Sequence, residues 1–299
     1  MSRFAKTLLF LTFTLLTAIP SLAEVDTSKV PIKKMTFDFT TTQTSYSDSW
    51  VGGEAGSFNW VSNLNAYTRS FLGEKYEARN RLKLSYGQTL SQDAETKQWN
   101  RPQKSTDQID FESMGIFLSE WHVNPYAAFR LESQFYDGRN RNKKLFLSPL
   151  VLTESAGATK ELYKKDTEFI FTRLGFALKQ TFTKSIVDTL ALTTDTGTDN
   201  EAGLESVSEA ELLLHRNIRY NGKLSLFKAF AYSKSDEFKG TPEENNWKAV
   251  DVNFENSFNA AVTKIISVNL YLQFLYDKEI SKKGRIKETI ALGFTFRMI

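Results

Sequence analysis

The stretch KYEARNRLKLSYGQ, from Lys75 to Gln88, decides the class of fold. Its even positions are mostly apolar or aromatic, and five of its odd positions are charged: Lys75, Glu77, Arg79, Arg81 and Lys83. Successive side chains of a β-strand point to opposite faces of a sheet. The pattern therefore predicts a strand with one charged face and one apolar face, longer than most strands of globular proteins.

The same alternation recurs along the chain and predicts about twelve strands, with little helical periodicity after residue 24. The expected strands cover residues 35–44, 55–68, 75–90, 106–121, 126–136, 167–181, 186–196, 207–217, 223–233, 248–262, 265–277 and 285–298. Long polar connections, such as 137–166, alternate with tight joins near Leu72-Gly73, Val123-Asn124-Pro125, Phe182-Thr183-Lys184, Tyr220-Asn221-Gly222 and Thr263-Lys264. Short turns at one end and long loops at the other are typical of an outer-membrane β-barrel.

Alternation alone leaves two orientations open, because a soluble barrel and a membrane barrel bury opposite faces. In the expected strand at 248–262, Val252 and Phe254 share one face, and Asn253 and Glu255 share the other. Three features favour an apolar face that contacts lipid. The strands are long enough to cross a bilayer, and aromatic residues recur near the ends of the apolar faces. The bore of a soluble barrel with so many strands would also be too wide for apolar side chains to fill. We therefore expect an all-β, transmembrane, antiparallel up-and-down β-barrel with short periplasmic turns and longer extracellular loops.

The N-terminus has the anatomy of a secretory signal peptide. Arg3 and Lys6 precede an apolar run, and Ser21-Leu22-Ala23 supplies the small residues of a cleavage site. The alternative, a membrane-anchoring helix, needs a longer apolar run. The chain is expected to reach the outer membrane of a Gram-negative bacterium, with a signal peptide at 1–23, a short periplasmic segment at 24–34 and the barrel at 35–299.

Net charge and amino-acid composition limit the classes of binding partner that the sequence predicts. Removal of residues 1–23 takes away Arg3 and Lys6 and lowers the formal net charge from +3 to +1, so the basicity gives no argument for a nucleic-acid partner. The chain has no cysteine, which excludes disulfides and thiolate metal sites. The expected partners are outer-membrane lipids, the barrel-assembly machinery and, for a channel, small solutes.

Segments near both ends of the chain resemble one family. They are SDSWVGGEAGSFNW at 47–60, FLSPLVL at 146–152, LSLFKAFAY at 224–232, WKAVDVNFENSFNAAVTKIISVNLYLQFLYDKEI at 247–280 and IKETIALGFTFRMI at 286–299. Together they resemble an uncharacterised, domain-of-unknown-function family of bacterial outer-membrane barrels. The resemblance implies the fold and the outer-membrane location, and it implies no activity and no catalytic residues.

Patterns that would support catalysis or metal binding are sparse. The two histidines are His122, in a short-turn region, and His215, on a polar strand face with Glu209 and Glu211. The chain has no Gly-x-Ser-x-Gly elbow and no His-Glu-x-x-His pair, and DTGTDNE at 195–201 lacks a complete calcium-loop pattern. We expect no catalytic residue, metal or cofactor. An outer-membrane hydrolase with acidic groups at the loop rim is the weaker alternative.

Two functions remain, and both depend on the lumen. Eight strands leave a bore filled by side chains and sixteen or more leave an aqueous pore, so about twelve lie between. One hypothesis is a narrow, porin-like diffusion channel that weakly favours anions, since the basic ladder outnumbers its nearby acids. The other is a closed structural or surface-binding barrel with an ion-paired lumen. The expected lumen-lining residues are Lys75, Arg79, Arg81, Lys83, Asp110, Glu112, Arg130 and Glu132.

Overall fold

Twelve long strands form one closed barrel in the computed structural model, which describes residues 31–46, 54–139, 143–165, 168–188 and 192–297. Going round the barrel, the order is β1, β14, β13, β12, β11, β10, β9, β8, β5, β4, β3 and β2, and neighbours are antiparallel. The barrel strands are β1 (Ile32–Thr44), β2 (Ser57–Leu72), β3 (Tyr76–Ser91), β4 (Gln103–Phe117), β5 (Asn124–Ser133), β8 (Leu150–Lys165), β9 (Glu168–Asp188), β10 (Thr193–His215), β11 (Ile218–Tyr232), β12 (Val250–Ala261), β13 (Ile266–Tyr276) and β14 (Arg285–Arg297).

Small elements occur in two of the connections. The short strands β6 (Tyr136–Asp137) and β7 (Leu145–Phe146) pair with each other between β5 and β8. A single 3₁₀ turn, η1 (Asn246–Lys248), precedes β12. Within the described residues, no helix has the length and apolar character that a membrane span requires.

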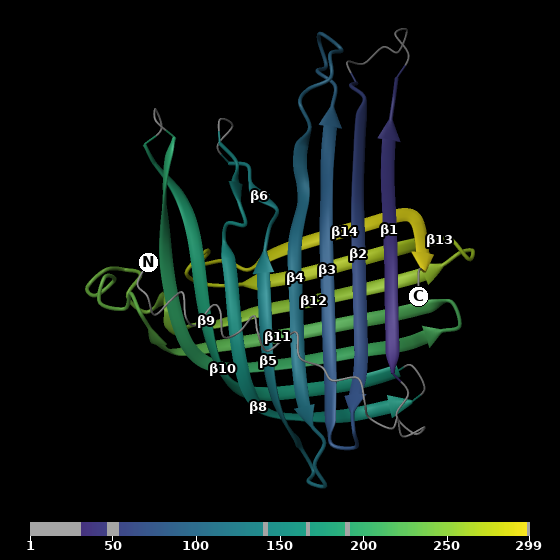
Figure 1. Ribbon diagram of the computed structural model, residues 1–299. Helices are drawn as coiled ribbons and strands as arrows, with labels where there is room; N and C mark the ends of the chain where they lie inside the picture. The colour runs from purple at the N-terminus through teal and green to yellow at the C-terminus, as the bar shows by residue number, and fades with distance from the viewer. Residues whose placement is uncertain (1–30, 47–53, 140–142, 166–167, 189–191, 298–299) are drawn as a thin grey trace.

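The two walls of the barrel cross one another. In Figure 1, β1 to β5 stand vertically at the front, pointing alternately up and down, and β11 to β14 run across behind them. Strands must tilt for a sheet to close into a barrel, so opposite walls seen from the side cross at a large angle. Side chains from the two walls therefore face each other across the lumen.

Burial along the strands is inverted relative to a soluble barrel. On β9, Leu174 and Phe176 are 61% and 68% exposed, whereas Arg173 and Ala177 are each 2% exposed. The outer surface is thus apolar, and the inner surface carries the charges. A barrel with this arrangement suits lipid around its outer face. The predicted transmembrane, antiparallel barrel is confirmed.

Aromatic rings form a band on the outer face near the end with the long loops. The Trp60 ring centroid lies 6.3 Å from Phe39 and 5.8 Å from Tyr86. Tyr86 in turn contacts Phe135 and Tyr136, with centroids 5.9 and 6.3 Å away. Such rings concentrate where the bilayer meets water, so the band marks the outer interface of the barrel.

Two strand assignments made from the sequence are wrong, although the expected number of strands is right. The sequence predicts a strand at 186–196, but β9 and β10 run into this region as one long hairpin. It predicts a loop over 137–166, but β8 lies there. The outer part of β10, residues 193–200, is polar on both faces, and β8 carries the small residues Ala156, Gly157 and Ala158 at its centre. Neither shows the apolar alternation that marks a membrane strand.

Two of the expected tight turns also lie inside strands. Residues 182–184 belong to β9, and 220–222 belong to β11, which follows a turn at Arg216-Asn217. Gly222 has a packing role, because a Cβ atom added there would lie 2.4 Å from the hydroxyl oxygen of Tyr220. The turn expected at Leu72-Gly73 is present, with Gly73 at a φ of 61° that glycine adopts freely.

The expected signal peptide and its cleavage site lie outside the described residues, which begin at residue 31. β1 begins at Ile32, inside the segment 24–34 that the sequence assigns to the periplasm. The expected strand at 223–233 takes a clear orientation as β11. Its Lys223 side chain enters the lumen, and Leu224, Leu226 and Lys228 point outward.

Candidate functional site in the lumen

The basic ladder of β3 lines the lumen. Arg79, Arg81 and Lys83 project from one face of the strand, and Leu82 projects from the other. Lys75 is a correction to the predicted set: it lies in the turn between β2 and β3, one residue before the strand begins, and it is exposed. The turn ends the alternation there, so Lys75 does not take part in the ladder.

Two cations of the ladder bind carboxylates on the opposite wall. Arg81 donates two hydrogen bonds to Glu209 of β10, each 2.6 Å long. Lys83 Nζ lies 2.9 Å from Glu255 Oε2 of β12. At least four strands separate β3 from β10 and from β12 around the ring. Both ion pairs therefore span the bore instead of lying along one wall.

The other predicted lumen residues are paired as well. Asp110 accepts two hydrogen bonds from Arg130, 3.0 and 2.8 Å long, and Glu132 lies 2.9 Å from the same guanidinium. Glu112 accepts a hydrogen bond from Arg173 of β9 at 2.8 Å. Arg79, the remaining member, forms an ion pair with Glu77 on its own strand.

Arg173 is the centre of a buried cluster of charges. Its side chain is 1% exposed and bridges Glu112 and Glu205, at distances of 2.8 and 3.1 Å from Nη2. Lys223 of β11 lies 3.8 Å from Glu112 and 3.6 Å from Glu209, and so links this cluster to the Arg81 pair. Opposite charges offset one another in this cluster, although Arg173 Nε and Glu205 Oε2 are buried without a hydrogen-bond partner among the described residues.

An apolar cluster fills part of the lumen toward the short-turn end. Met114, Ile116, Tyr126 and Phe171 are buried and pack together. The Arg79 guanidinium lies 4.6 Å from the centre of the Phe171 ring, which joins the cluster to the ladder. Toward the short-turn end, the lumen wall at β4, β5 and β9 is therefore lined by packed apolar side chains.

The predicted set of lumen-lining residues lacks several charged residues that form ion pairs in the lumen, among them Glu205, Glu209, Glu255, Arg173 and Lys223. Glu209 and Glu255 lie on polar strand faces, and this signal could have placed them in the lumen. Arg173 shares its lumen face with Phe171 and Ala177, so its strand gives no such signal. The ion-pair partner of each of these residues could not be predicted from the pattern, because pairing across the bore depends on how the barrel closes and how its strands tilt.

Groups with catalytic or metal-binding chemistry do not converge in the described part of the chain. His122 is exposed in the turn before β5, and His215 is exposed at the end of β10. DTGTDNE lies in β10, paired with β9, and is not a loop. Asp137 is bound by Arg139, whose hydrogen bond lowers the pKa of the carboxyl group. Among the described residues, no group of three or more His, Cys, Asp or Glu side chains could hold a metal ion.

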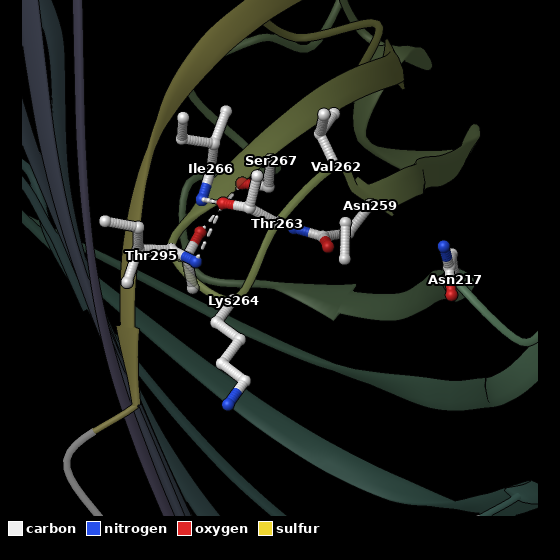
Figure 2. A pocket seen from close by; sticks show the side chains of 10 residues that line it. Asn217, Asn259, Val262, Thr263, Lys264, Ile266, Ser267 and Thr295 are labelled. Carbon is white, nitrogen blue, oxygen red and sulfur yellow. Dashed lines mark hydrogen bonds between the residues drawn. The ribbon is translucent and has the colours of Figure 1, made fainter.

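A pocket of about 510 Å³ opens at the short-turn end, beside the turn from β12 to β13. Figure 2 shows some of its polar groups bonded to one another: the Ser267 and Thr295 hydroxyls lie 2.8 Å apart, and Thr263 Oγ1 accepts the Ile266 N–H at 2.9 Å. Lys264 points away from them. The pocket is an open recess at the mouth of the barrel, and its polar groups do not converge on one point.

A closed antiparallel barrel with an apolar exterior, an aromatic band and a charged interior has the architecture of outer-membrane β-barrels. Residues 41–138, from β1 to just beyond β6, match a family described as "Protein of unknown function (DUF3078)". The match includes the SDSWVGGEAGSFNW segment. It confirms the predicted resemblance to a family of unknown function. No curated protein matches the chain.

Solved structures with a similar arrangement include three bacterial barrels. The COG4313 outer membrane channel from Pseudomonas putida F1 is 14% identical, with a TM-score of 0.41 over 94% of this chain and 98% of that chain. The translocator domain of the autotransporter NalP from Neisseria meningitidis is 8% identical, with a TM-score of 0.40 over 90% and 88%. The NanC porin is 9% identical, with a TM-score of 0.35 over 88% and 98%. At this level the similarities carry no argument about function.

Proposed function

We propose that this protein is a non-enzymatic outer-membrane barrel whose lumen is closed by ion pairs that cross it. The bidentate contact between Arg81 and Glu209 carries the proposal, because it joins two walls of the barrel with bonds of 2.6 Å. The contact between Lys83 and Glu255 adds a second cross-link. The protein then acts through its surfaces or through one part of the lumen, and not as an open pore.

The energetics support a closed resting state. Two unit charges in contact attract by on the order of 4 kcal/mol at the effective dielectric of a protein surface. A permeating ion would have to displace such a pair and then pass the apolar cluster of Met114, Ile116, Tyr126 and Phe171. The barrel should therefore conduct ions poorly.

The anion preference expected from the sequence requires basic groups without partners. Arg79, Arg81 and Lys83 each have a carboxylate partner. The ladder then presents little net positive potential to a solute, and the closed barrel that we propose has no anion selectivity.

A narrow channel is the second candidate. Its support is the partial exposure of two lumen side chains, Arg81 at 34% and Glu132 at 35%, which leaves room for water beside the ion pairs. A channel of this kind would pass only small ions, at low conductance, around the cross-links.

Fractionation and vesicle permeability test the proposal. The mature protein should fractionate with outer membranes, resist extraction by urea, and migrate differently on gels before and after boiling. Release by osmotic shock would contradict the location. Reconstituted in lipid vesicles, the wild type should leave them tight to small sugars and salts, and the double variant Arg81→Ala, Glu209→Ala should make them leak. Leakage from the wild type at the level of the variant would favour the channel.

A further inference from the structure

The first and last strands, β1 and β14, form the seam that closes the barrel, and they pair over only part of their length. β1 pairs with β14 over five residues, Thr36–Thr40 against Gly293–Arg297. Continuing this register would place Thr41 to Thr44 opposite Leu292 to Thr289. Both segments are strands, but no pairing joins them in the described structure. Thr41–Thr44 lies toward the long loops, so the gap in the wall is in the outer half of the barrel.

Exposure along both edges agrees with the gap. Thr41–Thr44 is exposed at every residue, and so is β14 from Arg285 to Ile290. In the middle of β9 a barrel strand shields alternate residues, such as Arg173 and Ala177, whereas the outer end of β10, residues 193–198, is also exposed at every position. Ile290 and Leu292 point outward at the gap and are 69% and 60% exposed.

The seam strand also carries the basic groups of the lumen that lack acidic partners. Arg285 and Lys287 share the lumen face of β14, because they pair with Leu275 and with Gln273 of β13. Neither forms an ion pair among the described residues, in contrast to Lys34, Arg81, Lys83, Arg173, Lys179, Arg219 and Lys223. The uncompensated positive charge of the lumen wall therefore lies beside the opening.

We propose that the outer half of the seam is a lateral binding site for a single-chain amphiphile with an anionic head group. The head group enters the lumen and binds Lys287 and Arg285, and the alkyl chain passes between the strands to lie against Ile290 and Leu292. This inference rests on the proposed function, because the ion pairs close the lumen below the site and leave the side opening as its route.

Charge complementarity favours this occupant over a second protein strand. A strand inserted from a second copy would satisfy the free backbone groups of both edges, but it would leave the two cations without acidic partners. The threonine hydroxyls and the water of the lumen can meet those backbone groups instead. An anionic head group supplies the negative charge that Arg285 and Lys287 lack, and an alkyl chain packs against the apolar side chains on the outer face.

Binding of a fluorescent long-chain fatty acid to the folded barrel in zwitterionic nanodiscs tests the site. The wild type should bind the probe, and the alcohol of the same chain length should bind about tenfold or more weakly. The double variant Arg285→Gln, Lys287→Gln should lose affinity for the acid by a similar factor and keep its affinity for the alcohol. Retention of acid binding in this variant would overturn the proposal, as would failure of the wild type to bind.

A disulfide across the gap separates the lateral route from any other route. The chain has no cysteine, so Thr42→Cys with Ala291→Cys places one reactive pair at positions of β1 and β14 that would face each other if the pairing continued. Oxidation should abolish binding, and reduction should restore it. The control, Asn269→Cys with Ala291→Cys, joins strands that are already paired and should bind normally when oxidised. Unchanged binding after oxidation across the gap would refute the lateral route.

The remaining outcomes are also decisive. Disulfide-linked dimers of the single variant Thr42→Cys, formed in the membrane, would show that a second copy occupies the edge, and would overturn the proposal. Vesicle permeability is measured on the same samples. A leaky wild type that binds the fatty acid refutes the closed lumen alone, and a tight wild type that does not bind refutes the lateral site alone.

Discussion

Placing arginine on the outer face of β13 should destabilise the barrel strongly, and placing it one residue away should not. Leu270 is the fifth of the eleven residues of β13, close to the middle of the span, and its cross-strand neighbours are Phe258 and Ile290. An arginine facing lipid near the bilayer midplane costs about 2 to 4 kcal/mol. Leu270→Arg should therefore shift the folding equilibrium by about 30-fold to 1,000-fold.

Asn269→Arg is the matched control. Asn269 lies on the lumen face, where it accepts a hydrogen bond from Asn259 and donates one to Ser267 at 3.3 Å. Its replacement loses these bonds, at about 1 kcal/mol, and leaves the cation in a polar lumen. The assay is reversible urea unfolding in lipid vesicles, followed by tryptophan fluorescence. A cost for Asn269→Arg equal to or above that of Leu270→Arg would refute the assignment of the faces.

Three further predictions concern packing, buried charge and pH. Arg173→Met should destabilise the barrel by about 3 to 5 kcal/mol in the same assay, because Glu112 and Glu205 lose their shared partner. Adding Glu112→Gln and Glu205→Gln should recover much of that loss. An unrecovered loss would contradict the assignment of Arg173 as the partner of both carboxylates. Gly175→Ala should cost about 1 to 3 kcal/mol, because its Cβ would lie 2.4 Å from the Ala156 carbonyl oxygen, whereas Gly115→Ala, with nothing within 4 Å, should be close to neutral; equal effects would contradict this packing. Burial and the charges of Glu201 and Asp277 raise the pKa of Glu279, in the loop before β14, to about 7. The folded state then binds this proton more tightly than the unfolded state does, so stability should fall as pH rises from about 4.5 to about 7 and then level off. Glu279→Gln should flatten that slope in thermal melts, and an unchanged slope would exclude Glu279 as its source.

Alternation was sufficient to predict the class of fold and the face of each well-patterned strand. Arg79, Arg81 and Lys83 fall on the lumen face because a strand has a period of two, whatever surrounds it. The same rule fails where the two faces of a strand do not differ in polarity. The outer end of β10 is polar on both faces and the middle of β8 is built from small residues, so β8 is missed and a separate strand is expected near the tip of the β9–β10 hairpin.

Contacts between opposite walls could not be predicted in this way. The distance from Arg81 to Glu209 depends on how many strands lie between them, how far the strands tilt and how the ring closes. None of these quantities is local in the sequence. Two errors in strand placement leave the count of twelve intact, yet they would change which residues meet across the bore. The short register between β1 and β14 likewise appears only when the ring is closed.

Single-channel recording with a charge swap tests the central claim, that ion pairs across the lumen close the barrel. Wild type, Glu209→Arg, and the double variant Arg81→Glu, Glu209→Arg are reconstituted in planar bilayers after each is shown to be folded by its gel shift. The account predicts no steps from the wild type, frequent steps from Glu209→Arg, because the two like charges repel, and silence again from the swapped pair. Steady conductance from the wild type, unchanged in both variants, would contradict it.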